Sequence, residues 1–222
     1  MSVTSRRLAS FYQTAVGKKA VMAVTGLILF LWLVLHVLGN LQIFLGRDQI
    51  NRYSAFLHAT PEALWPVRII LIVAIVLHIN SAVLLYLQKV KNRPVGYTKK
   101  GNRGATVMSR TMMWSGFALL VFIILHLLHM TTGTIHKDFI AGDVFHNLTF
   151  AFHQPTVVAL YVLAMALLAM HLYHGLYSFT QSLGVSNPRH TSRIKPLAAA
   201  FAIVMASLFA LVPIAVLAGF VH

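Results

Sequence analysis

The chain has 222 residues, of which 58% are hydrophobic and only 10% are charged. A soluble domain carries roughly 25% charged residues, so the composition excludes an ordinary water-soluble protein and indicates one that is solvated by lipid. Cysteine is absent, which excludes structural disulfides, thiolate-bound iron–sulfur clusters within this chain and covalently attached c-type haem.

Five stretches contain no Lys, Arg, Asp or Glu: 20–46, 69–88, 111–136, 155–183 and 196–222. Each is long enough for a spanning helix, which needs roughly 20 apolar residues. In lipid, an apolar segment must satisfy its own backbone and therefore forms a helix. We predict an all-α integral membrane protein, a single transmembrane domain over residues 1–222, with helices over about 20–45, 66–89, 110–133, 155–183 and 196–220.

The net charge of +14 is distributed unevenly along the chain. Most basic residues precede the first span or lie between spans two and three or spans four and five: Arg6, Arg7, Lys18, Lys19, Lys89, Lys91, Arg93, Lys99, Lys100, Arg103, Arg110, Arg189, Arg193 and Lys195. The acids lie in the other two loops: Asp48, Glu62, Asp138 and Asp143. Basic loops stay cytoplasmic, so we expect the N-terminus inside and the C-terminus outside. The basic face suits anionic lipid or a peripheral partner, and this distribution argues against nucleic acid.

Spans one and three share a pattern of a hydroxyl residue, a glycine and a distant histidine. The first span contains Thr25-Gly26 and reaches His36 ten residues after the glycine. The third contains Ser115-Gly116 and reaches His126 at the same interval. The residues between glycine and histidine are aliphatic or aromatic throughout.

Spans two and four form a second, looser pair. His78 is followed by Gln88, and His171 is followed by Gln181, in each case ten residues later. Two related pairs of helices predict a pseudo-symmetric four-helix bundle, with the fifth helix appended to it.

The depth of each histidine follows from the helical rise of 1.5 Å per residue, counted from the nearest basic residue. His36 and His126 then lie roughly 24–25 Å from the inner face, and His78 lies roughly 16 Å from it. His171 matches His78 through the glutamine interval. The expected result is an outer pair, His36 and His126, and an inner pair, His78 and His171.

Histidines within a spanning segment face the bundle interior and point to a function. A proton relay would favour carboxylates among them, and no span contains one. A zinc site needs three or four converging ligands, whereas each level supplies two. Two imidazoles from facing helices suit a b-type haem, although a single buried histidine is more often a satisfied core residue.

Other histidines leave alternatives open. His129 and His174 lie three residues after His126 and His171, nearly on the same helix face, and could replace them as ligands or bind haem propionates. The repeat favours His126 and His171. A solvated or interfacial role is expected for the histidines in loops or at the chain end: His58, His136, His146, His153, His190 and His222.

Several smaller features have both a structural and a functional interpretation. Gly26, Gly116 and Gly175 could give a flat cofactor room beside the helix backbone or could simply allow close helix packing. An interfacial aromatic belt is expected to include Trp32, Trp65 and Trp114. Pro213 predicts a kink in the fifth span, which looks like lipid-facing support because it has no histidine or charge.

Four histidines on the first four of five helices carry a family resemblance. In the segments "TGLILFLWLVLH", "IVLHINSAVLLY", "SGFALLVFIILHLL" and "LLAMHLYHGLYSFTQSLG", the chain resembles the di-haem cytochrome b membrane anchor of succinate:quinone oxidoreductases and quinol:fumarate reductases. The resemblance extends from about residue 14 through the fifth span.

The resemblance implies two non-covalent b haems. His78 and His171 would be the axial ligands of the proximal haem, and His36 and His126 those of the distal haem. Flavoprotein and iron–sulfur subunits would dock on the cytoplasmic face of a bacterial inner membrane and carry out the dicarboxylate chemistry. This chain would be the quinone-side subunit of that enzyme, exchanging electrons with a quinone, most often menaquinone.

A carboxylate near the distal haem would be expected to transfer the quinone protons, and Glu62 is the only glutamate in the chain. A plain charge at a helix N-terminus is the alternative role for it. Candidate propionate partners are Lys18, Lys19, Lys89 and Arg110 for the inner haem and Arg47, Arg52 and Arg68 for the outer. Two other functions remain in competition: a cytochrome b subunit of another quinone-linked enzyme, such as a hydrogenase or formate dehydrogenase, and a cofactor-free transporter or structural membrane protein.

Overall fold

The structure is a computed structural model that describes residues 10–92, 107–182, 184 and 188–221, without the side chains of residues 107–110 and 188–190. Several of the basic residues considered above therefore lie outside the described side chains: Arg6, Arg7, Arg93, Lys99, Lys100, Arg103, Arg110 and Arg189.

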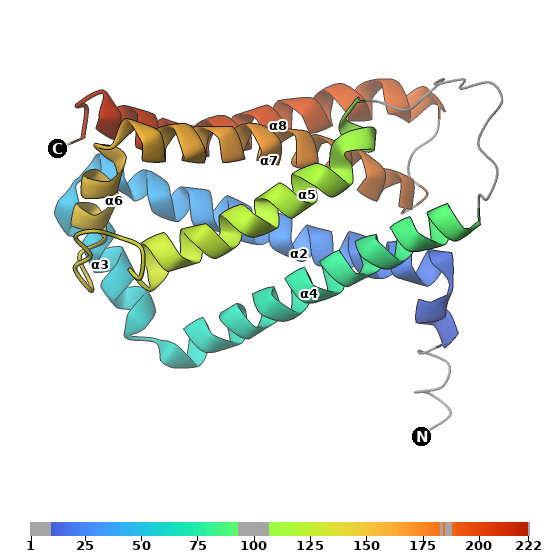
Figure 1. Cartoon of the computed structure of the whole chain (residues 1–222), viewed down its shortest axis with the longest axis horizontal. Helices are drawn as coiled ribbons and strands as arrows, with labels where there is room; N and C mark the ends of the chain where they lie inside the picture. Colours follow the sequence, from blue (N-terminus) through green and yellow to red (C-terminus); the bar gives the residue numbers. More distant parts are fainter. Residues whose placement is uncertain (1–9, 93–106, 183, 185–187, 222) are drawn as a thin grey trace.

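Five long helices form the described part of the chain, together with shorter helical segments at one end (Figure 1). The long helices are α2 (Ala15–Leu41), α4 (Pro61–Lys91), α5 (Val107–His126), α7 (Pro155–Ser182) and α8 (Pro188–Leu217). The shorter segments are η1 (Gln42–Leu45), α3 (Arg47–His58), η2 (Leu127–Thr131) and α6 (Val144–Phe152). The predicted all-α membrane fold is confirmed, since all five long helices are long and apolar enough to cross a bilayer.

Local sequence explains where these helices begin. Thr14 caps α2 by accepting a hydrogen bond from the backbone N–H of Gly17 at 2.9 Å. The helices α4, α7 and α8 each begin at a proline, a residue suited to the first helical turn because that turn needs no intrahelical N–H donor. Gly46 has a φ of +96°, which lets the chain turn sharply between η1 and α3.

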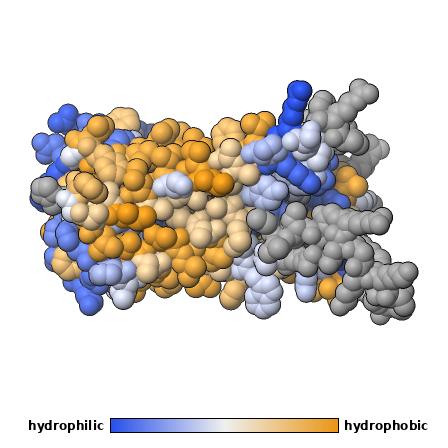
Figure 2. All heavy atoms as spheres, turned by 90° about the horizontal axis from the view of Figure 1, so that it is seen from above, coloured by the Kyte–Doolittle hydropathy of each residue, from blue (hydrophilic) through white to orange (hydrophobic). Residues whose placement is uncertain are grey.

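The surface matches a lipid environment. Figure 2 shows hydrophobic side chains over the middle of the visible face and hydrophilic ones toward both ends. Large apolar side chains within the candidate spans, such as Leu35, Ile72 and Val204, are more than half exposed. Because water would penalise such a surface, it belongs in contact with acyl chains.

The helices pack in two pairs. The helix α2 lies along α4 and α5 lies along α7, while α8 packs along α7 and also contacts α2. This arrangement places spans one and two opposite spans three and four. The described ends of the chain lie at opposite ends of the molecule (Figure 1), as an odd number of crossings requires.

The helix α8 is more than lipid-facing support. One of its faces is exposed, but Ala202, Met205 and Ala206 are buried in a core with residues of α2, α5 and α7. The expectation of lipid-facing support thus describes the exposed face of α8, whereas small side chains on its other face let it approach α7 closely. The helix continues past Pro213 to Leu217, and a kink at that proline stays a prediction.

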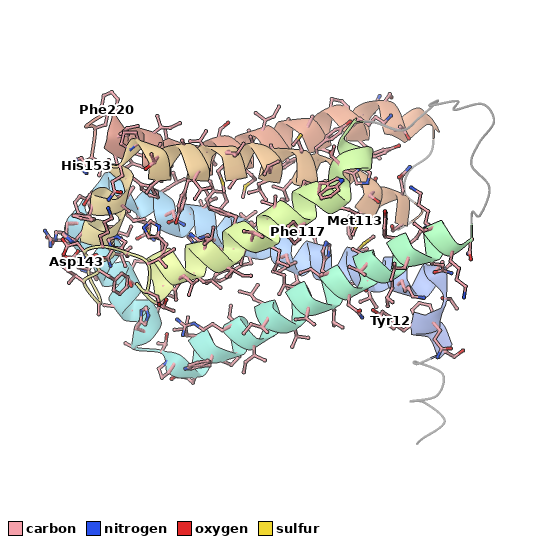
Figure 3. All side chains as sticks on the ribbon, in the orientation of Figure 1. Tyr12, Met113, Phe117, Asp143, His153 and Phe220 are labelled. Carbon is pink, nitrogen blue, oxygen red and sulfur yellow. The ribbon has the colours of Figure 1, made fainter. Side chains whose placement is uncertain are left out.

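The loops between spans one and two and between spans three and four are not simple turns. They contain α3 and α6, which contact each other across the end of the bundle. Asn51 of α3 donates to Asp143 Oδ1 at 2.9 Å and accepts from the backbone N–H of Phe145 at 3.0 Å. Asp143 also pairs with Arg47 and caps α6 (Figure 3). These contacts form an ordered polar cap over one end of the bundle.

Candidate functional site: two histidine pairs inside the bundle

The four histidines singled out from the repeat meet in two pairs. His78 of α4 and His171 of α7 have ring centroids 6.4 Å apart, with 56° between their ring planes. His36 of α2 and His126 of α5 have ring centroids 5.9 Å apart, with 80° between their planes. Each pair therefore joins one helix of the first half of the chain to one helix of the second.

The spacing of the rings fits one iron atom between them. An imidazole nitrogen lies about 2.0 Å from a bound metal and roughly 1.1 Å from its ring centre, so two axial imidazoles place their centroids roughly 6 Å apart. The observed distances of 6.4 and 5.9 Å lie at that value. Within the described residues, no group of three or more His, Cys, Asp or Glu gathers in a way that could hold a metal ion, so these two-histidine pairs are the sites to consider.

The inner pair is held by the hydroxyl–glycine segments of the neighbouring helices. His78 Nδ1 lies 3.1 Å from the carbonyl oxygen of Met22 and 3.3 Å from Thr25 Oγ1. His171 Nδ1 lies 3.4 Å from Ser115 Oγ. The same arrangement therefore occurs in both halves of the bundle: α2 supports the histidine of α4, and α5 supports the histidine of α7.

The glycines of the repeat leave room for these rings. A Cβ atom at Gly26 would lie 3.2 Å from His78 Cε1, and one at Gly116 would lie 3.4 Å from His171 Cε1. A Cβ at Gly175 would have no neighbour within 4 Å. Gly26 thus makes room where the imidazole of His78 lies close against the helix backbone, a Cβ at Gly116 would just reach ordinary contact with His171, and the structure gives Gly175 no such role.

The outer pair lies in a different environment. His126 Nδ1 is 3.4 Å from the hydroxyl of Tyr161, which is also 3.0 Å from His129 Nδ1. His36 packs between Trp32, whose ring stacks on it at 5.9 Å, and Phe209 of α8 at 5.7 Å. Trp32 therefore lies against a histidine inside the span, and its predicted place in an interfacial belt was wrong.

Sequence reasoning missed Tyr161 as part of this site. The signal was present, because Tyr161 precedes His171 by the same ten residues that separate Gly116 from His126. Since α5 and α7 are consecutive spans that run in opposite directions, equal intervals from the inner level reach the same outer level. The interval thus predicts the contact that the structure shows.

The alternative histidines occupy secondary positions. His129 lies in the π-helical segment η2 and packs its ring 5.0 Å from that of His136. His174 is partly buried one turn beyond His171 on α7. The rings that face a histidine of the other half of the chain are those of His171 and His126, opposite His78 and His36 respectively, rather than those of His174 and His129.

The loop histidines differ from one another. His58 and His153 are exposed, as expected, and His146 is half-buried beside Asp138. His136 is buried, which contradicts the expected solvated role. Its Nε2 donates to the carbonyl of Asn147 at 2.9 Å, and its Nδ1 accepts from the backbone N–H of Asp138 at 3.2 Å, so it serves as a structural link in the loop before α6. His190 and His222 lie outside the described side chains.

The carboxylate and basic candidates are near the ends of the bundle. Glu62 is exposed in the first turn of α4, the end of that helix opposite Lys89. Of the proposed propionate partners, Arg47 pairs with Asp143, Arg68 stacks over the ring of Trp65 at 5.3 Å, and Lys18 donates to the carbonyl of Gln13 at 2.6 Å: three of them thus have other contacts.

The environment of Asp143, outside the spans, displaces the pKa of its carboxyl group. Partial burial raises its pKa, but hydrogen bonds from Asn51, the His146 backbone N–H and Arg47, together with the charge of Arg47, outweigh that effect. The pKa of Asp143 is lowered from its ordinary value of 3.8 as a result. The carboxylate is therefore ionised across the physiological range, where it joins α3 to α6.

A five-helix bundle of membrane-spanning length, with facing histidine pairs at two levels, defines a multi-pass membrane protein. Comparison with protein families identifies the family to which the chain belongs. The model of the succinate dehydrogenase/fumarate reductase transmembrane subunit matches residues 89–210, more than half of the chain. The chain therefore belongs to this family, whose members associate with the other subunits of that oxidoreductase.

The match begins near the end of α4 and covers α5, α7 and most of α8, so it includes His126 and His171. His36 and His78 lie before it, and their assignment depends on the internal repeat and on the geometry above. Comparisons with curated proteins and with solved structures gave no match.

Proposed function

We propose that this chain binds two b-type haems between its histidine pairs and relays electrons between an iron–sulfur subunit and a membrane quinone. The inner pair, His78 and His171, would be the axial ligands of one haem. The outer pair, His36 and His126, would be those of the other. The observation that supports the proposal most strongly is the approach of the four rings in two pairs at about the spacing that an intervening iron needs.

When bound, each haem supplies an iron centre that changes oxidation state by one electron. The two imidazoles of a pair would hold the iron from both sides, which would leave it no site for substrate and would suit it to electron transfer. The two levels are separated by ten residues on α2 and ten on α5, about 15 Å along each helix. The histidines would thus hold the two haems at two depths, so that electrons cross the low-dielectric core in shorter steps.

The distribution of charge supports a direction for the chain in the membrane. Six of the ten described basic side chains lie at the start of α2, the end of α4 and the start of α8: Lys18, Lys19, Lys89, Lys91, Arg193 and Lys195. The other end has four basic side chains, Arg47, Arg52, Arg68 and Lys137, balanced by the four acids, Asp48, Glu62, Asp138 and Asp143. By the positive-inside rule, the basic end would face the cytoplasm of a bacterial inner membrane. The flavoprotein and iron–sulfur subunits would dock there, next to the inner pair.

The quinone, which we propose to be menaquinone, would react near the outer pair. Reduction of a quinone takes up protons, so a titratable group close to that level is required. Glu62 is the candidate that the sequence offers, and the first turn of α4, where it lies, would be at the outer end of that helix in the proposed orientation. Glu62→Gln would test this role, because it keeps the side-chain size and removes the exchangeable acid proton.

Affinity purification of the chain from its native membrane tests the proposed function. We expect a flavoprotein and an iron–sulfur subunit to co-purify, and succinate or a reduced menaquinone analogue to reduce b-type haem in the complex. A chain that purifies with neither subunit and shows no b-type absorbance would contradict the proposal and favour a cofactor-free membrane protein.

A further inference from the structure

Each inner histidine faces a hydroxyl residue and a glycine that are adjacent in sequence on the neighbouring helix. We call Thr25 with Gly26 on α2, and Ser115 with Gly116 on α5, the two hydroxyl–glycine clamps. We propose that the clamp hydroxyls are positioning residues that fix the tautomer of the inner histidines and tune the electron affinity of the iron between them. This inference rests on the proposed function, since it assigns a role toward the inner haem.

The first clamp shows which atom carries the proton. Thr25 Oγ1 lies 2.7 Å from the carbonyl oxygen of Val21, to which it can only donate. Its hydrogen is thereby used, so toward His78 Nδ1, at 3.3 Å, the oxygen acts as an acceptor. The carbonyl of Met22, at 3.1 Å from the same nitrogen, is also an acceptor. Both contacts require a proton on Nδ1 of His78.

The second clamp repeats this arrangement. Ser115 Oγ donates to the carbonyl of Met112 at 3.1 Å and therefore accepts from His171 Nδ1 at 3.4 Å. Ser115 is only 3% exposed, so water does not replace it easily. In both inner histidines the proton is on Nδ1, and the lone pair is on Nε2, which remains for the metal.

The clamps also affect the metal electronically. An acceptor at the Nδ1 proton makes an imidazole more basic, and a more basic ligand favours the more positively charged, ferric state. The two sides of the inner pair are unequal, because His78 has both a carbonyl and a hydroxyl acceptor, whereas among the described residues the acceptor for His171 is Ser115 alone. Removing the Ser115 hydroxyl should therefore perturb the inner haem more than removing that of Thr25.

The test is a redox titration of the holo-complex with three variants and a matched control. Ser115→Ala and Thr25→Val remove the hydroxyls, and Ser115→Thr keeps the hydroxyl and reproduces the residue of the first clamp. Thr180→Val is the control, because its hydroxyl donates to the carbonyl of Tyr177 at 2.8 Å on a different part of α7. The readouts are the midpoint potentials of both haems and the low-spin electron paramagnetic resonance signals of the ferric state.

For Ser115→Ala we expect a higher midpoint potential of the inner haem, seen as a several-fold larger ferrous-to-ferric ratio at the wild-type midpoint. The shift should be smaller for Thr25→Val and absent for Ser115→Thr and Thr180→Val, and the outer haem should not change. If Ser115→Ala cannot hold the inner haem, its recovery in Ser115→Thr supports the clamp, and equal loss in both contradicts it.

Two results would overturn the inference in different ways. Two haems in the wild type, with an unchanged inner potential in Ser115→Ala, would refute the clamp and leave the proposed function standing. A wild-type complex without haem would refute the proposed function and the clamp together.

Discussion

The substitution Gly26→Ala offers a quantitative test of the inner site, because the added methyl group would meet a single side chain. Its carbon would lie 3.2 Å from His78 Cε1 and 3.5 Å from His78 Nδ1. Carbon atoms rest at about 3.5–4.0 Å, so the imidazole must retreat by roughly 0.3–0.8 Å. That movement also lengthens its hydrogen bond to the Met22 carbonyl, now 3.1 Å.

The expected magnitude follows from the cost of overpacking, about 1–3 kcal/mol for extra methyl groups in a well-packed site. If that cost falls on the haem-bound state, the inner haem should dissociate about 5–150-fold more readily. Gly116→Ala should have a smaller effect, because its Cβ would lie 3.4 Å from His171 Cε1. Gly175→Ala is the matched control on the same kind of helix, since nothing lies within 4 Å of its added carbon.

The assay is transfer of haem from the purified complex to excess apomyoglobin, followed by absorbance, with low-temperature reduced spectra to separate the two haems. We predict that Gly26→Ala loses its inner haem fastest, Gly116→Ala more slowly and Gly175→Ala at the wild-type rate. Wild-type retention in Gly26→Ala, or equal loss in Gly175→Ala, would refute the reasoning that these glycines make room for the imidazoles.

Three further predictions follow from the site and the polar cap. Replacing His78 or His171 with Ala should abolish the inner haem signal and keep part of the outer one in difference spectra; loss of the outer signal alone would reverse the assignment of levels. Replacing His129 with Gln should leave both haems bound, and a missing haem in that variant would transfer the ligand role to it. Because the pKa of Asp143 is lowered in the folded state, its contribution to stability is complete above its ordinary pKa of 3.8 and is lost as pH falls through the folded value. The protection of backbone amides at the start of α6, taken relative to their intrinsic exchange rates at each pH, should therefore fall with acidification in that range, and Asp143→Asn should show the low protection at neutral pH without this pH dependence.

The spanning helices could be predicted from sequence because lipid imposes a length and excludes charge. The five uncharged stretches correspond to the five long helices, but the boundaries differ: α4 runs from Pro61 to Lys91, beyond its uncharged stretch at both ends, whereas α5 ends at His126, short of residue 136. The boundaries differ because a helix continues through the interfacial zone, where charged side chains such as Glu62 and Lys91 are tolerated.

The pairing of the rings could also be predicted, since equal intervals along helices that cross the same slab place residues at equal depths. Contacts that depend on side-chain packing had no such signal. The burial of His136 depends on the loop before α6 folding back so that Asn147 can accept from its ring. Likewise, the contact of Phe209 with His36 depends on how closely α8 approaches α2. A hydropathy pattern carries no information on either arrangement.

The most direct test of the central claim is the haem content of the purified holo-complex, measured together with a redox titration and the electron paramagnetic resonance spectrum of its ferric state. Paired imidazoles at two levels predict two b haems per chain, two titration steps and low-spin signals of bis-histidine iron. A chain with no haem, a single haem, or high-spin iron with an open axial position would contradict it.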